Sequence, residues 1–325
     1  MTKRSSVGLI YFIVALMTLL LRVTGSIGIY DALGVDADIY FTLVVQLLIF
    51  GALPLIAYFL FAQKQNGGKF LDNIKAECSD FGCKKVSGKN IVRTIVIAIC
   101  MIFIAGVVSY VWQTILSIIG YKSVSTPTDF SSIGVLFSQL FFVAVLPGVF
   151  EEVTHRGLLF AGYRETGWKF VLVSALLFSL MHQNITQTGY TFFDGVVIAL
   201  VMYYTRSIYP SIFIHLLNNT VATVESYVAQ NGGFLSFITV VQEWFVSSIW
   251  GYLAFIAIGI VLLILMVFMF KRMRDDSAKN NYIPKQFFDK GDANALPLHK
   301  DIFLWATIFV GVSATIFSLV WGIMR

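Results

Sequence analysis

The stretch Phe150-Glu-Glu-Val-Thr-His-Arg156 places two adjacent glutamates, a histidine and an arginine inside a long, mostly apolar run. Residues 133–149 precede this stretch, and residues 157–162 continue the apolar character after it. An ionisable group in a membrane helix costs at least ~2.5 kcal/mol by insertion scales, so such groups usually mark functional sites. The stretch therefore predicts a membrane helix that carries chemistry.

The composition of the whole chain is typical of a polytopic membrane protein. Of the 325 residues, 58% are hydrophobic and only 13% are charged, whereas soluble domains carry about 25% charged residues. The mean hydropathy of +0.80 agrees with this class. We assign the net charge of +5 to cytoplasmic loops and not to the binding of nucleic acid.

Long apolar runs define the predicted architecture, because about 20 apolar residues cross a bilayer as one helix. The sequence contains nine such runs, at residues 7–24, 39–62, 91–118, 133–162, 168–183, 190–204, 208–229, 249–270 and 302–324. The predicted fold is an all-α transmembrane bundle of about nine helices. We expect three regions: N-terminal helices with a basic loop over 1–130, a catalytic core over 131–229, and C-terminal helices with a basic loop over 230–325.

The distribution of Lys and Arg predicts the orientation, because short cytoplasmic loops are enriched in these residues. With a cytoplasmic N-terminus, 20 of the 23 Lys and Arg residues fall on inner segments, and the exceptions are Arg22, Lys122 and Arg325. The predicted outer loops Ser26–Asp38 and Gln230–Ser247 contain neither residue type. We therefore expect a multi-pass protein of the cell membrane, surrounded by the lipid bilayer, with its N-terminus in the cytoplasm.

Three short motifs place polar residues on the fourth, fifth and seventh apolar runs. They are Glu151-Glu152-x-x-x-Arg156, Phe178-x-x-x-His182 and His215-x-x-x-Asn219. Residues four apart lie on one face of a helix, so Glu152 is expected to pair with Arg156, and Glu151 is left without that partner. If the fourth and fifth helices form an antiparallel hairpin, Glu151 and His182 lie at the same depth, about 20 Å from the turn at 1.5 Å per residue.

Two further positions in the membrane region attract attention. Asp194 lies near the outer end of the predicted helix 190–204, so we expect it to have an interfacial role. Pro147 is expected to kink the fourth helix, because proline removes a backbone hydrogen bond and clashes with the preceding turn.

The ordered motifs resemble the CAAX-protease and bacteriocin-processing family (CPBP, or Abi), whose members are intramembrane endopeptidases that are conventionally called metalloproteases. The family pattern is EExxxR, then FxxxH, then HxxxN, each on its own transmembrane helix, and it covers roughly residues 133–228 here. His155 departs from this pattern, because the family often has an aromatic residue at that position. The signatures HExxH, GxGD and GxSG of other intramembrane hydrolases are absent from the sequence.

The resemblance implies a CAAX-type endopeptidase that hydrolyses peptide bonds of membrane-associated peptides or proteins. The catalytic residues would be Glu151, His182, His215 and Asn219, with Glu152 and Arg156 in a supporting ion pair. We expect Glu151, together with His182, to activate a water molecule as general base. His215 and Asn219 would then stabilise the tetrahedral oxyanion by hydrogen bonds.

The sequence leaves the cofactor and the class of function open. Glu151, His182 and His215 are candidate ligands for a divalent metal such as zinc, with a fourth position for water, but a mechanism with glutamate and histidine alone has also been proposed for the family. The alternative function is a non-catalytic membrane immunity or scaffold protein that binds a bacteriocin peptide or a sensor partner. A transporter would show repeated halves with broken helices, and the sequence shows no such repeat.

Overall fold

The computed structural model describes residues 2–26, 42–66, 69–123, 128–233, 236–280 and 297–324, and within these ranges the chain is helical with no β-strand. The predicted outer loop Ser26–Asp38, apart from its first residue, and most of the second basic loop fall outside the described residues. In chain order, the elements are α1 (Lys3–Ser26), η1 (Val44–Ala52), α4 (Leu53–Asn66), α5 (Phe70–Asp80), α6 (Gly88–Ile118), α7 (Ile133–Gln139), η2 (Leu140–Val145), α8 (Leu146–Glu152), η3 (Val153–Leu158), α9 (Leu159–Tyr163), η4 (Arg164–Thr166), α10 (Lys169–Met181), α11 (Ile185–Thr205), α12 (Tyr209–Asn231), α13 (Phe237–Ser247), α14 (Ile249–Lys279), η6 (Leu298–Lys300) and α15 (Ile302–Met324).

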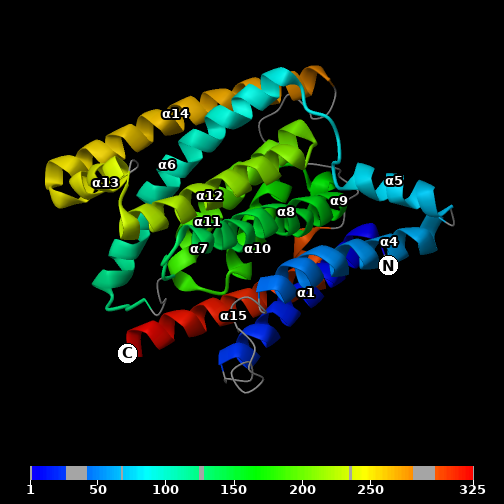
Figure 1. Ribbon diagram of the computed structural model, residues 1–325. Coiled ribbons are helices and arrows are strands. Elements are labelled where there is room, and N and C mark those ends of the chain that lie inside the picture. The colour runs from blue at the N-terminus through cyan, green and yellow to red at the C-terminus, as the bar shows by residue number, and fades with distance from the viewer. Residues whose placement is uncertain are drawn as a thin grey trace.

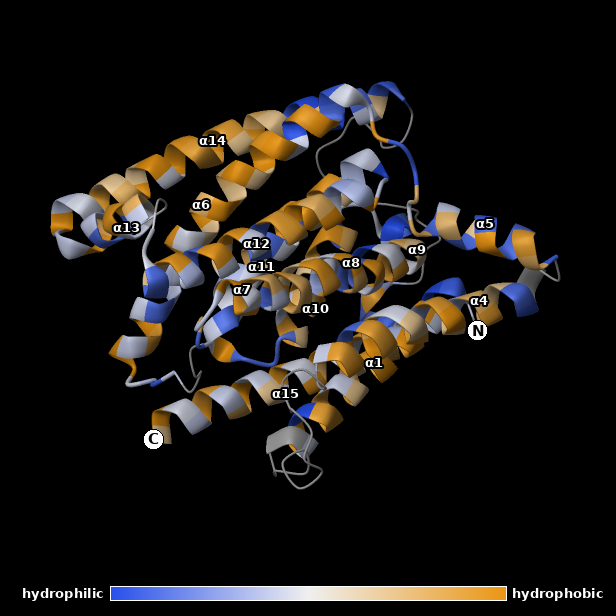
Figure 2. Ribbon diagram, in the orientation of Figure 1, coloured by the Kyte–Doolittle hydropathy of each residue, from blue (hydrophilic) through white to orange (hydrophobic). Residues whose placement is uncertain are grey.

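The helices form three layers, with α8 to α12 in the middle (Figure 1). On one side, α6 packs against α11 and α12, and α14 covers α6. On the other side, α1 packs against α9 and α15, while η1 packs against α8. The outer helices are hydrophobic along most of their length, and hydrophilic residues gather at the ends of α6 and α14 (Figure 2). The middle layer is therefore the part of the bundle that can bury polar side chains.

The number of membrane-crossing helices differs from the sequence prediction. In the described part of the chain, seven helices are long and apolar enough to cross a membrane, so the predicted count of nine is not confirmed. The helix α10 has only 13 residues, which is about 20 Å at 1.5 Å per residue. The helix α12 has 23 residues, but the polar residues near His215 lower its hydropathy. Both helices nevertheless lie in the middle layer (Figure 1).

The fourth predicted helix is continuous but irregular. Two π-helical segments, η2 and η3, flank the short helix α8 on either side, and Pro147 lies in the first turn of α8. Because proline has no backbone N–H, the turn before it cannot keep the regular hydrogen-bond pattern. Insertions of π-helix are frequent at functional sites, where they redirect side chains. Here they flank the two adjacent glutamates at the end of α8.

A glycine allows this helix to approach its partner closely. A Cβ atom on Gly148 would lie 3.1 Å from the backbone nitrogen of Leu216 in α12, which is closer than ordinary packing allows. The absence of a side chain at Gly148 thus brings the backbones of α8 and α12 together. As a result, the residue before Leu216, His215, lies beside the glutamates of α8.

Charged residues tie the N-terminal helices to the core at the end where α1 begins. The carboxylate of Asp80, at the end of α5, accepts hydrogen bonds from Lys3 (2.6 Å) and Tyr58 (2.7 Å). It also forms an ion pair of 3.3 Å with Arg164, in the turn between α9 and α10. One carboxylate thus joins α1, α4, α5 and the turn between α9 and α10.

Glu77 makes the stability of this region dependent on pH. Burial, followed by the nearby negative charge of Asp80, raises the pKa of Glu77 from 4.5 to about 7. The folded protein then binds the proton more tightly than the unfolded chain, so this contribution to stability is present below the unfolded pKa and is lost as the pH rises through the folded pKa. We expect the melting temperature to fall between pH 4.5 and about pH 7, with a weaker dependence in Glu77→Gln. The exposed Asp72→Asn change in the same helix is the control, and an unchanged slope in Glu77→Gln would contradict the expectation.

The predicted orientation can be tested with single cysteines in a background where Cys78, Cys83 and Cys100 are replaced. In intact cells, we expect a membrane-impermeant maleimide to label Glu243→Cys, which is exposed on α13. Asn280→Cys, exposed at the end of α14, should react only after the membrane is permeabilised, because positively charged segments stay in the cytoplasm. The reverse pattern would invert the orientation, and labelling of both positions in intact cells would contradict the alternation of the helices.

Candidate active site

The two motif residues that were expected to pair do so in the centre of the bundle. Arg156 donates a hydrogen bond of 2.7 Å to Oε1 of Glu152, and neither side chain is exposed to solvent. The guanidinium also donates to the carbonyl of Gly195 in α11 (3.4 Å) and lies 4.4 Å from the ring centroid of Phe178. This buried pair links η3 to both α10 and α11.

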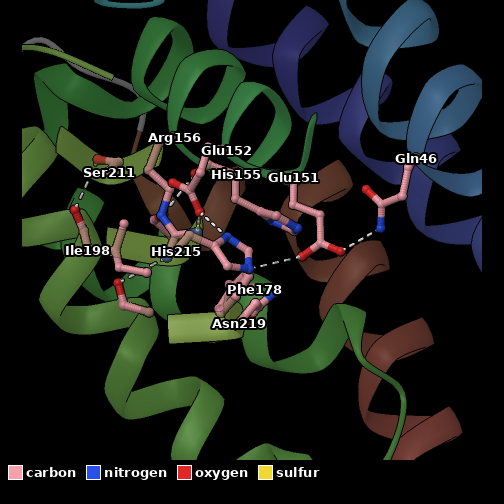
Figure 3. A network of polar contacts seen from close by, with 12 residues as sticks. Gln46, Glu151, Glu152, His155, Arg156, Phe178, Ile198, Ser211, His215 and Asn219 are labelled. Carbon is pink, nitrogen blue, oxygen red and sulfur yellow. Dashed lines mark hydrogen bonds and ion pairs between the residues drawn. The ribbon is translucent and has the colours of Figure 1, made fainter. Parts of the chain in front are cut away.

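His215 joins the ion pair from α12, which carries the third motif. Its Nδ1 lies 2.8 Å from Oε1 of Glu152, the same oxygen that Arg156 contacts. Because an ionised carboxylate only accepts hydrogen bonds, this Nδ1 carries the proton and donates it. The other ring nitrogen, Nε2, then points toward Glu151, as Figure 3 shows, and lies 4.0 Å from its Oε2. Glu152 therefore fixes the orientation of the imidazole.

Glu151 lies at the boundary of two cavities and is only partly buried. Its Oε1 accepts a hydrogen bond of 2.8 Å from Gln46 of η1, so the carboxylate is held between Gln46 and His215 (Figure 3). The separation of 4.0 Å from Nε2 of His215 is longer than a hydrogen bond. One carboxylate oxygen thus has a partner, and the other faces the space beside the histidine.

His182 lies at the end of α10, and it lines the same two cavities as Glu151. Its Nδ1 lies 2.9 Å from the carbonyl oxygen of Phe178. A carbonyl can only accept, so Nδ1 donates and Nε2 has no proton in the neutral ring. The Phe178 ring lies between the two imidazoles, with centroid distances of 5.0 Å to His182 and 5.6 Å to His215. The structure thus brings all three motifs to one place.

Asn219 also lines the larger cavity, one turn after His215 on α12. Its amide donates a hydrogen bond of 2.9 Å to the carbonyl of Val143 in the π-helical segment η2. The amide nitrogen has two protons, so a second donor remains after this contact. Asn219 therefore fixes the irregular backbone of η2 and still has a hydrogen to offer within the cavity.

The larger cavity has a volume of about 650 Å³ and extends along α12 away from the glutamates. Its lining includes His215 at one end and Gln230 at the other. These two residues are about 22 Å apart along the axis of α12, at 1.5 Å per residue. At the far end, Gln230 hydrogen-bonds with Thr128 and Phe130. The cavity is long enough to hold an extended segment of peptide beside the polar group.

Two residues near the motifs, Gln46 and Asp194, have positions that the sequence did not indicate. Gln46 comes from a hydrophobic helix and carries no motif, and its contact with Glu151 joins residues 105 positions apart. Asp194 is 3% exposed and lines the large cavity, so the expectation of an interfacial role is wrong. The helix α11 begins at Ile185 and not at Tyr190, which places Asp194 well inside the helix.

His155 fills a position that is surrounded by aromatic rings. Its Nδ1 shares a hydrogen bond of 2.6 Å with the hydroxyl of Tyr11, and its ring contacts Tyr11, Phe50 and Phe178 at centroid distances of 5.0 to 5.6 Å. The buried imidazole packs as an aromatic ring would, which accounts for the departure from the family pattern. Tyr11 then satisfies Nδ1 of the histidine, whereas Nε2 has no hydrogen-bond partner among the described residues.

The candidate metal ligands do not form a preassembled site. Among the described ranges, no three His, Cys, Asp or Glu side chains are grouped so that they could hold a metal ion. Glu151, His182 and His215 therefore do not meet as a ligand set in this arrangement, although all three line the same cavity. Nδ1 of each histidine is hydrogen-bonded, to Phe178 and to Glu152, so Nε2 would be the nitrogen that binds a metal.

Comparison with known proteins agrees with the motifs. Residues 133–221 match the family model described as type II CAAX prenyl endopeptidase Rce1-like. No curated protein and no solved structure matches the chain. The matched segment lies within the predicted core 131–229 and contains all three motifs. Together with the membrane-spanning helices, the match indicates a membrane protease, and it supports the resemblance of residues 133–221 to the CAAX-protease and bacteriocin-processing family.

Proposed function

We propose that the chain is an intramembrane endopeptidase of CAAX type, in which Glu151 is the general base. The observation that supports this most directly is the position of its carboxylate. Gln46 holds one oxygen at 2.8 Å, and the other faces the cavity beside His215 and His182. A carboxylate oriented in this way can take a proton from a water molecule as that water attacks a peptide carbonyl.

The other motif residues would assist this reaction from fixed positions. His182 has its Nδ1 proton bound to a backbone carbonyl, so its Nε2 can accept a proton from the water together with Glu151. His215 in its doubly protonated form can donate from Nε2 to the oxyanion, because the Glu152 carboxylate stabilises its positive charge. The second amide proton of Asn219 is a further donor for the oxyanion. When the peptide bond breaks, the proton taken by the base passes to the leaving amine.

The substrate would be a membrane-associated peptide or protein that lies along the cavity. If the N-terminus is cytoplasmic, the end of the cavity at Thr128 and Gln230 lies on the outer side of the membrane. An extended segment would then enter between the start of α7 and the end of α12 and reach Glu151 within the bilayer. The residues that line this path are polar as well as apolar, as hydrolysis requires water to enter.

The experiment that tests this function is a cleavage assay with purified protein and quenched fluorescent peptides. The wild type is compared with Glu151→Gln, and each is measured with and without a chelator. Cleavage by the wild type alone supports the proposal, and loss of this activity with the chelator would show that a metal takes part. If the wild type cleaves no peptide, or if the variant cleaves equally well, the proposed function is wrong.

A further inference from the structure

A second cavity adjoins the first one at the level of α11. It has a volume of about 610 Å³ and lies between α6, α11 and α12. The two cavities share lining residues, among them Gln187, Tyr190, Asp194 and Asn218. The space beside the glutamates therefore continues sideways past α11, into a region that the reaction proposed above does not use.

Asp194 lies on the wall that the two cavities share. Its side chain is 3% exposed, and Oδ1 has no hydrogen-bond partner among the described residues. The neighbouring cation, Arg156, is bound to Glu152 and to the carbonyl of Gly195. A buried carboxylate oxygen without a hydrogen-bond partner is costly, and buried carboxylates are normally paired with a cation.

No lysine or arginine from the described part of the chain lines these cavities, and His215, which lines the main cavity, is bound to Glu152. The described residues that line them include Glu151, Asp194 and Glu225, but neither Lys nor Arg. Glu225 lies on α12 at the outer part of the second cavity and is partly buried. The sideways space is thus polar and acidic, although the chain as a whole carries a net charge of +5.

We propose that this second cavity is a specificity pocket for a basic side chain of the peptide substrate, with Asp194 as the residue that binds its ammonium or guanidinium group. This proposal rests on the proposed peptidase function. The main cavity holds the peptide backbone next to Glu151, and the lysine or arginine side chain extends past α11 into the adjoining space. Gln187, Tyr190 and Asn218 accept its remaining hydrogen bonds, and Glu225 adds negative charge at the outer end.

If Asp194 has only a structural role, its replacement should have a different effect from the one expected for a specificity pocket. If Asp194 stays neutral or only balances the charge of Arg156, its replacement changes folding or the general rate, and it affects every peptide to the same extent. If Asp194 binds a basic side chain, the effect depends on the charge of the substrate. The comparison of charged and uncharged peptides therefore separates the two roles.

The test uses internally quenched apolar peptides that each contain one lysine, placed at a different position in each peptide, and a norleucine twin of each. We expect the wild type to prefer the lysine member at one position. In Asp194→Asn, kcat/KM for that lysine peptide should fall by ~10²-fold, mainly through KM, because loss of one partner from a buried charge pair is costly. Its norleucine twin should change far less, and Asp194→Glu should recover part of the preference.

Asp129→Asn is the matched control, since it removes the same charge from an exposed residue beside the outer end of the main cavity. It should keep the lysine preference, because exposed charges are screened by salt. Equal losses for lysine and norleucine peptides in Asp194→Asn, or no lysine preference in the wild type, would overturn the pocket and leave the peptidase function intact.

Binding separates a failure of the pocket from a failure of the proposed function. The affinity of Glu151→Gln for the same peptide pairs is measured by fluorescence anisotropy and compared with that of the double variant Glu151→Gln, Asp194→Asn. If lysine-selective binding depends on Asp194 but the wild type cleaves nothing, the pocket is supported and the peptidase is not. If neither member of any pair binds, the pocket is refuted.

Discussion

Replacement of Glu151 by glutamine is expected to lower the rate of peptide cleavage by ~10²–10⁴-fold, which is the usual contribution of a positioned general base. The physical reason is that an amide cannot take the proton of the attacking water. Glutamine has nearly the same shape as glutamate, so the contact with Gln46 (2.8 Å) can persist through the amide oxygen. The protein should therefore remain folded while its activity is lost.

The measurement is a turnover rate together with a melting curve for each variant. Glu165→Gln is a suitable control, because Glu165 is exposed in the turn between α9 and α10 and lies outside the cavities. This control should cleave at the wild-type rate. If Glu151→Gln is inactive only because it no longer melts cooperatively, the loss has a structural cause. If the variant retains its cellular function, that function is not proteolytic, as the immunity or scaffold alternative requires.

The second large effect concerns the ion pair of Glu152 and Arg156. Both side chains are fully buried, and removal of one partner leaves an uncompensated charge that typically costs ~3–5 kcal/mol. Glu152→Gln should therefore reduce the yield of folded protein and the free energy of unfolding. The same change also removes the carboxylate that holds Nδ1 of His215 at 2.8 Å, so the activity of the remaining folded protein should fall too.

A double variant tests whether the destabilisation comes from the unpaired charge. Glu152→Leu with Arg156→Met replaces both members by apolar groups, and such replacements of a buried pair are often neutral or stabilising. We expect the double variant to be more stable than either single variant, although it should be inactive. Unfolding by heat or denaturant in detergent measures this difference. Full stability in Glu152→Gln alone would show that the pair does not stabilise the fold.

The contacts of this pair show that it orients neighbouring side chains more clearly than it stabilises the fold. Oε2 of Glu152 and Nε of Arg156 have no hydrogen-bond partner among the described residues, so the pair is not fully satisfied. A well-packed apolar core of the same volume could be as stable. What the pair provides instead is geometry, because Glu152 orients His215 and Arg156 contacts the Phe178 ring at 4.4 Å. These contacts align the three motif helices.

Much of the fold class and of the site could be predicted from sequence, because the relevant signals are local. Long apolar runs identify membrane helices without knowledge of their partners. The spacing of four residues places Glu152 and Arg156 on one helix face, and their ion pair of 2.7 Å confirms that prediction. The three motifs share one cavity, as expected if their helices are neighbours. The catalytic roles of these residues and the orientation of the chain remain predictions.

Other features depend on contacts between residues that are far apart in the chain, and these were decided only by the tertiary structure. The partner of Glu151 is Gln46, and that of His155 is Tyr11, 144 residues away. No periodicity in the sequence encodes such pairs. The position of Asp194 depends on where α11 begins, at Ile185, and the predicted count of nine spans is not confirmed among the described residues, where α10 has only 13 residues. Local hydropathy and spacing thus determined the helices and their polar faces. Packing between the layers determined which polar groups meet, because only close packing fixes the distances between side chains that are remote in sequence.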